Sequence, residues 1–391
     1  MIPYPLRVAL AVPAWSAETY RAALAAFVDR DKELDRLKSF FLTRFKVADA
    51  LLCASGSLAL EIALRRCGVV PGDEVIIPTF CCTAIVPPIL NVGAVPVLAD
   101  VGAELNITPK NVAAALTEKT RAVIVPHLFG NPAEIAAITE IAHARNVHVI
   151  DDAAQALGAT IDDRPVGSFG DAGIVSFGAE KICFGIGGGV ALSRHNDFFA
   201  GVELPPGSKA SAARRFASTV LRRRWRRWTF PAETFFSKPP PDAPPAPYRR
   251  ETMENLSAAV AHSLLSHLGD NIAARRDRVR MYRELLAGEQ RLQLIAHRPG
   301  SACLAQVIRV RPKNSPDDAA ARVLDVLRGV GYEIQGSYVP IHLLPAYTHW
   351  SRQPLRHAED IWGDLVELPC EPNVRMKDVE RIAAIVRRVV R

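Results

Sequence analysis

Residues 176–189 read SFGAEKICFGIGGG and begin at the end of an apolar run, residues 172–177, that is predicted to be a β-strand. Within this stretch Lys181 lies between a hydroxyl residue, Ser176, and a segment rich in glycine. An earlier apolar run, residues 147–152, ends in two carboxylates. A lysine considered alone is usually a solvated surface residue. The order of these residues, rather than any one of them, therefore indicates a binding site where two strands end.

The pattern around Lys181 matches the needs of an aldehyde cofactor. A lysine forms a Schiff base with pyridoxal phosphate, and a carboxylate holds the protonated ring nitrogen of that cofactor. A buried aspartate is costly unless a cation pairs with it, and the ring nitrogen is such a cation. Asp152 suits this role and Asp151 a structural one. The alternative, equally supported by these residues alone, is that the aspartates cap the following helix.

Residues 53–60, CASGSLAL, place small and hydroxyl residues directly before an apolar-periodic helix. The first N–H groups of a helix, its dipole and the Ser57 hydroxyl together suit an anion such as phosphate. Ser176 supplies a second hydroxyl close to the lysine. The alternative is that a serine here is an ordinary N-cap.

The chain alternates short apolar runs with helical patterns from about Asp49 to Ser193, which is typical of an α/β fold with a mainly parallel sheet. Ligands of such sheets bind where the carboxyl ends of the strands meet, and both Asp152 and His127 fall at such ends. The predicted strands are residues 74–78, 95–100, 121–126, 147–152, 172–177 and 189–192, and the helices between some of them are residues 57–66, 108–117 and 132–145.

Three parts are predicted along the 391 residues, of which 49% are hydrophobic. Residues 1–200 form a large α/β domain. Residues 201–250 are an insertion or linker, rich first in arginine and tryptophan and then in proline, because the stretch KPPPDAPP at 238–245 cannot continue a helix or a central strand. Residues 251–391 form a helical connection over 254–286 and a smaller α+β domain that ends in an amphipathic helix over 376–390.

Composition favours a cytoplasmic protein. Seven cysteines without framework spacing indicate a reducing compartment. No stretch approaches the roughly 18 apolar residues of a membrane span, and the histidines and cysteines show no metal-ligand spacing, so no metal is predicted.

Much of the net charge of +7 is concentrated in residues 214–230, where arginines alternate with tryptophans. Such a segment suits peripheral contact with an anionic membrane or with the pyrophosphate of a substrate. Nucleic acid is an unlikely partner. The alternative is a solvated helix face whose aromatic residues pack on the body of the protein.

An ordered set of motifs resembles the DegT/DnrJ/EryC1/StrS family of pyridoxal-phosphate-dependent sugar aminotransferases, which have the fold-type I architecture. The motifs are SGS at 55–57, PGDEVIIP at 71–78, HLFG at 127–130, DDAAQ at 151–155, GSFGD at 167–171 and SFGAEK at 176–181. The resemblance resumes over 253–286 and over 338–347, YVPIHLLPAY. It implies an α/β large domain, a smaller C-terminal domain and a homodimer that shares its active sites.

The resemblance also implies roles for individual residues. Lys181 would form the Schiff base and then move a proton, Asp152 would hold the ring nitrogen, and Gln155 would approach the ring hydroxyl. Gly56, Ser57 and Ser176 would bind the phosphate. His127 would lie near the reacting groups and is predicted to be catalytic together with Lys181 and Asp152.

Three departures from the family pattern mark this chain. Cys82 replaces the aromatic residue that stacks on the cofactor ring, so less of the ring is covered. Thr252 ends the stretch Arg250–Thr252, which stands where relatives have Asn-Tyr-Arg, so Arg249 or Arg250 is a candidate substitute for the phosphate ligand. Glu371 occupies a position that often carries histidine.

The predicted function is transfer of an amino group, with glutamate as the expected donor, to a keto-sugar that is expected to be nucleotide-linked. One alternative is a divergent protein of the same fold that acts on a non-sugar or lipid-linked substrate. Another is a non-catalytic scaffold that docks on a membrane or on nucleic acid. A related dehydratase is disfavoured, because those relatives replace the Schiff-base lysine with histidine.

Overall fold

The computed structural model of the chain describes residues 8, 13–27, 32–229, 247–311, 319–350, 352 and 354–391. The side chains of residues 222–229 lie outside this description, as does the proline-rich stretch 238–245. The predicted docking role of residues 214–230 therefore stays a prediction.

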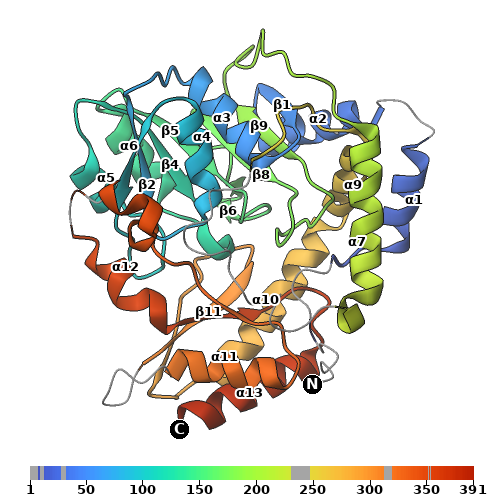
Figure 1. Cartoon of the computed structure of the whole chain (residues 1–391), viewed down its shortest axis with the longest axis vertical. Coiled ribbons are helices and arrows are strands. Elements are labelled where there is room, and N and C mark those ends of the chain that lie inside the picture. Colours follow the sequence, from blue (N-terminus) through green and yellow to red (C-terminus); the bar gives the residue numbers. More distant parts are fainter. Residues whose placement is uncertain are drawn as a thin grey trace.

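A seven-stranded sheet forms the centre of the larger part of the molecule (Figure 1). Its neighbours β3, β2, β4, β5 and β8 are parallel, whereas β9 is antiparallel to both β8 and β1. The prediction of a mainly parallel sheet is confirmed. In spatial order the strands are β1 (Asp49–Cys53), β9 (Gly189–Ser193), β8 (Ala172–Ser176), β5 (His148–Asp152), β4 (Thr120–Pro126), β2 (Glu74–Pro78) and β3 (Val95–Ala99).

Helices cover both faces of this sheet, which explains why its strands read as nearly continuous apolar runs. Ile76, Val123 and Val149 pack against α5 (Pro109–Ala115) and α6 (Ile135–His143). Their neighbours Ile77 and Ile124 point to the other face, where α3 (Gly56–Arg66) and α4 (Val86–Asn91) lie.

A layer of helices lies beyond β1, where α9 (Asn255–Ser266) contacts α1 (Ala17–Ala25), α2 (Lys32–Phe45) and α7 (Lys209–Thr229) (Figure 1). The helical pattern over 254–286 is two helices rather than one. The backbone of His267, with φ −107° and ψ 13°, ends α9, and α10 (Leu268–Leu285) starts at the next residue.

The C-terminal part is built on a four-stranded antiparallel sheet in the order β10 (Leu292–Leu294), β11 (Ala305–Val310), β13 (Leu365–Pro369) and β12 (Gln335–Gly336). Helices α11 (Ala319–Gly329) and α13 (Met376–Val390) pack on it, and α13 has the predicted bounds. The remaining short elements are β6 (Thr160–Ile161), β7 (Arg164–Pro165), α12 (Arg356–Ile361) and the 3-10 turns η1 (Thr83–Ile85), η2 (Leu128–Gly130), η3 (Ile341–Leu343), η4 (Pro345–Trp350) and η5 (Trp362–Asp364).

The described residues include no helix with both the length and the apolar character that a membrane crossing needs. The division into residues 1–200, 201–250 and 251–391 stays a prediction.

The two sheets meet at a close backbone contact after β4. The N–H of Leu304 donates to the carbonyl of Phe129 at 2.8 Å, and the N–H of Ala302 donates to the carbonyl of Gly130 at 2.9 Å. Gly130 has φ 78°, and a Cβ there would lie 2.7 Å from the backbone nitrogen of Leu304. Only glycine therefore fits this junction without a shift of the backbone.

We expect Gly130→Ala to lower the melting temperature of the protein more than Gly68→Ala does. Gly68 has φ 72°, but a methyl group there meets nothing within 4 Å. Gly68→Ala therefore costs only the roughly 1–2 kcal/mol of holding an alanine in the left-handed backbone region. Gly130→Ala adds a collision with backbone on the opposite side of the junction. Thermal denaturation of both variants measures the difference, and equal losses would show that the junction relaxes without cost.

Candidate active site

A cavity of about 170 Å³ opens at the carboxyl ends of the parallel strands. It brings together seven of the eight predicted site residues, namely Gly56, Ser57, Cys82, Asp152, Gln155, Ser176 and Lys181. The other residues that line it are Ser55, Leu60, Cys81, Ala84, Ile85, Pro126, Leu128, Ala154 and Ile174.

One end of the cavity is the N-terminus of α3. Ser55 caps the helix and accepts the N–H of Leu58 at 3.1 Å, which leaves the first N–H groups, those of Gly56 and Ser57, without a partner inside the helix. The hydroxyls of Ser57 and Ser176 line the same space, and a Cβ on Gly56 would lie 3.2 Å from Oγ of Ser176. Two hydroxyls and a helix N-terminus without an intervening side chain suit a phosphate.

Strand β9 passes directly behind this helix end. A Cβ on Gly189 would lie 2.4 Å from the backbone nitrogen of Gly56, so the glycine lets the two backbones touch. The next glycine, Gly188, donates its N–H to the carbonyl of Ala54 at 3.2 Å. The glycine-rich segment after Lys181 therefore borders the same candidate phosphate site at the start of α3.

Asp152, at the end of β5, presents a carboxylate to the cavity. Burial raises the pKa of the Asp152 carboxyl above its ordinary value, and the N–H of Ala154 and the charge of Lys181 oppose this shift only in part. A carboxylate in this condition gains from a cation in the cavity. A protonated pyridine nitrogen meets that need, so the donor set fits pyridoxal phosphate.

Gln155 is held by a contact that the sequence did not reveal. Its Oε1 accepts the N–H of Phe129 at 3.1 Å, and its Nε2 donates to the hydroxyl of Tyr338 at 3.1 Å. The ring of Tyr338 stacks on Phe129, with centroids 5.9 Å apart. The loop that carries Tyr338 is anchored near β2, because Ile341 donates its N–H to the carbonyl of Thr79 at 2.7 Å.

His127 does not line the cavity, contrary to its prediction as a catalytic residue. Its ring is completely buried, its Nε2 lies 2.6 Å from Oδ1 of Asp151, and its Nδ1 accepts the N–H of Ala133 at 2.8 Å. The accepted N–H requires the proton to lie on Nε2, which therefore donates to Asp151. Because both ring nitrogens are engaged within the protein, neither nitrogen is free to bind a ligand, and the catalytic role of His127 stays a prediction.

Two of the three departures from the family pattern, Cys82 and Glu371, lie around the lysine. Cys82 is half-buried and lines the cavity. Glu371 lies on the other side of Lys181, where both residues line a second cavity of about 30 Å³. Burial raises the pKa of Glu371, and its Oε2 has no hydrogen-bond partner among the described residues.

The arginines proposed as substitutes for the missing phosphate ligand are engaged elsewhere. Arg250 makes a two-point contact with Glu61 on α3, at 2.6 and 2.7 Å. Arg249 pairs with Glu254 and donates to the carbonyl of Ala54 at 3.2 Å. Glu61 is distant from Arg250 in the chain, so the sequence around Arg250 gives no sign of this contact, whereas Glu254 follows Arg249 by only five residues.

Comparison with known proteins agrees with this site. The model of the DegT/DnrJ/EryC1/StrS aminotransferase family matches residues 17–387. The GDP-perosamine synthase of Caulobacter vibrioides is 30% identical over 349 residues, which cover 88% of this chain and 86% of that protein. The UDP-N-acetyl-3-dehydro-alpha-D-glucosamine 3-aminotransferase of Acidithiobacillus ferrooxidans is 30% identical over 348 residues, 88% of this chain and 85% of that protein.

Among solved structures, the aminotransferase TlmJ from Streptoalloteichus hindustanus is similar over 98% of both chains, with a TM-score of 0.75 and 25% sequence identity. The predictions of the fold, of an aminotransferase and of pyridoxal phosphate as its cofactor are confirmed. Its sequence, fold and cavity together establish that the chain belongs to the DegT/DnrJ/EryC1/StrS aminotransferase family.

Proposed function

We propose that this aminotransferase moves an amino group from glutamate to the keto group of a nucleotide-linked sugar. The observation that carries the proposal is the presence of Lys181, Asp152 and the α3 N-terminus around one cavity. The two relatives named for reactions on nucleotide-linked sugars support the choice of acceptor.

Each lining group has a task in this proposal. Pyridoxal phosphate, when bound, supplies a ring that accepts the electron pair left on carbon when a proton is removed. Lys181 would hold the cofactor aldehyde through Nζ and would move the proton between carbon atoms. Asp152 would keep the ring nitrogen protonated. Gly56, Ser57 and Ser176 would bind the phosphate, and Gln155, which Tyr338 orients, would bind the ring hydroxyl.

The wider setting of the reaction is also a proposal. We infer a homodimer in which the partner subunit completes the active site, as the family resemblance implies, and light scattering of the purified protein tests it. All seven cysteines are free thiols, which supports a reducing compartment such as the cytoplasm. Contact of residues 214–230 with a substrate pyrophosphate or an anionic membrane belongs to the same proposal.

We expect the wild-type protein with pyridoxal phosphate to show a visible absorbance band that Lys181→Ala lacks. Addition of glutamate should convert the wild-type band to that of the amine form of the cofactor, because the donor leaves its nitrogen behind. A nucleotide-linked keto-sugar should then restore the original band. Absorbance spectra recorded after each addition measure the two halves of the reaction separately.

The matched control is Lys110→Ala, which removes an exposed lysine on α5 and should leave every band as in the wild type. A response to glutamine but not to glutamate would replace the proposed donor. A wild-type protein that binds the cofactor but responds to neither donor would contradict the proposed reaction and favour a non-catalytic scaffold.

We expect Asp152→Asn to weaken the binding of pyridoxal phosphate at least tenfold, equivalent to about 1.4 kcal/mol. The variant keeps an oxygen for the N–H of Ala154 but loses the charge that pairs with the ring nitrogen. It should not destabilise the cofactor-free protein, because it removes a carboxylate whose charge burial disfavours. Titration of the cofactor-free protein and its melting temperature test the two halves of this prediction.

Asp151→Asn is the neighbouring comparison. Asp151 is fully buried and accepts from Nε2 of His127 at 2.6 Å and from the N–H of Phe169 at 2.8 Å. An asparagine has one acceptor oxygen, so one donor loses its partner at a cost of about 1–3 kcal/mol. This variant should lower the melting temperature. If Asp151→Asn weakened cofactor binding more than Asp152→Asn does, Asp151 would be the residue that holds the ring nitrogen and Asp152 the structural one.

A further inference from the structure

The loop that follows Lys181 is fixed by three side chains that come from distant parts of the chain. Nδ2 of Asn271, on α10, donates to the carbonyl of Ile182 at 3.1 Å. Nε1 of Trp15 donates to the carbonyl of Phe184 at 2.7 Å, and Nε of Arg215 donates to the carbonyl of Ile186 at 2.7 Å. Alternate carbonyls between the lysine and the glycines are thus each tied to a different segment.

Arg215 lies on α7, in the arginine-rich insertion. Its guanidinium also donates to Oγ of Ser211 at 2.8 Å, to Glu254 at 2.8 Å and to Ser257. Phe216, the next residue, stacks on Trp15 with ring centroids 5.6 Å apart. Helix α7 therefore supports two of the three fixed carbonyls.

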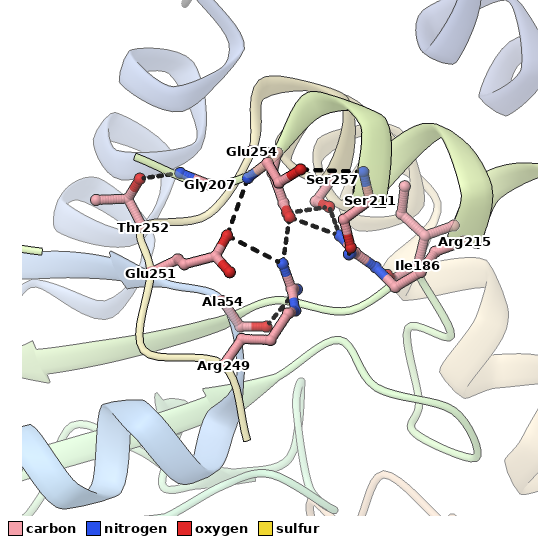
Figure 2. Close-up of polar contacts among 11 residues, drawn as sticks. Ala54, Ile186, Gly207, Ser211, Arg215, Arg249, Glu251, Thr252, Glu254 and Ser257 are labelled. Atoms are coloured by element: carbon pink, nitrogen blue, oxygen red, sulfur yellow. Dashed lines mark hydrogen bonds and ion pairs between the residues drawn. The ribbon is translucent and has the colours of Figure 1, made fainter. Parts of the chain in front are cut away.

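Glu254 joins Arg215 to a second arginine, Arg249 (Figure 2). Only 1% of the Glu254 side chain is exposed. Burial alone would raise the pKa of Glu254, but the hydrogen bonds and charge of Arg215 and Arg249 outweigh it, and the net shift is downward. A buried carboxylate that accepts hydrogen bonds from two arginines holds both guanidinium groups in place, because moving either one away breaks hydrogen bonds to a buried charged group.

Arg249 connects this network to the loop before α3, which also borders the candidate phosphate site. Its Nη2 donates to the carbonyl of Ala54 at 3.2 Å, and this same carbonyl accepts the N–H of Gly188. The N–H of Ala54 donates to the backbone carbonyl of Glu251 at 3.0 Å. Ala54 is directly followed by the capping serine of α3, so the network reaches both loops that border the helix end.

We propose that Arg215 and Arg249, joined by Glu254, are positioning residues for the cofactor phosphate. They hold the carbonyls of Ile186 and Ala54 and so fix the spacing between the glycine loop and the start of α3. The proposal rests on the assignment of the phosphate to the α3 N-terminus made above. It gives helix α7 a role in supporting the active site from outside the cavity.

The test compares pyridoxal phosphate with pyridoxal, which lacks the phosphate, in titrations of the cofactor-free protein. The dissociation constant of pyridoxal divided by that of pyridoxal phosphate gives a ratio that is larger when the phosphate contributes more of the affinity. We expect Arg215→Met, which keeps the packing of the side-chain stem but loses the donors, to reduce this ratio about tenfold, with the affinity for pyridoxal nearly unchanged. Arg215→Lys should recover part of the loss.

Arg214→Met is the matched control, because Arg214 is the exposed neighbour on the same helix, and its ratio should equal that of the wild type. Glu254→Gln should shift the ratio in the same direction as Arg215→Met, and it keeps the test open if Arg215→Met does not fold. A lower melting temperature with an unchanged ratio in both variants would overturn the proposal, because the network would then only stabilise the fold.

The test also separates this proposal from the proposed reaction. A wild-type protein that binds pyridoxal phosphate far more tightly than pyridoxal but does not respond to an amino donor would contradict the reaction alone. A reduced ratio in Arg215→Met would still support the positioning role. Equal wild-type affinities for the two compounds would remove the phosphate assignment and with it the positioning role.

Discussion

The contact between β9 and the start of α3 is the constraint on which the site depends. There is no room for a side chain at Gly189, because a Cβ would lie 2.4 Å from the nitrogen of Gly56. This contact requires β9 to run antiparallel between β8 and β1, which returns the chain from Lys181 to the helix end. The helix N-terminus is a neighbour of the lysine and the glycine loop for this reason, although it lies much earlier in the sequence.

The sequence was most informative where the pattern is local. Strand β2 and helix α13 have the predicted bounds because a continuous apolar run marks the strand and apolar periodicity marks the helix, and motifs of a few residues located the cavity lining. Strand β1 was not predicted. Its five residues show no regular alternation of burial, and its pairing depends on β9, which lies much later in the chain.

Contacts between distant residues account for what the sequence did not supply. A histidine at a strand end suggested catalysis, but only the structure shows that Asp151 and the N–H of Ala133 use both nitrogens of His127. The partner of Gln155, Tyr338, is in a different part of the chain. Arg250 was a candidate phosphate ligand, but Glu61, which is distant in the chain, binds it.

The three fixed carbonyls after Lys181 link the cofactor site to three distant segments of the chain. Trp15, Arg215 and Asn271 belong to segments that must all have docked before the lysine loop has its final shape. A ligand that binds only the finished loop stabilises every segment that helps to build it, by mass action. Binding of the cofactor is therefore expected to stabilise the folded positions of all three segments, although they are far apart in the chain.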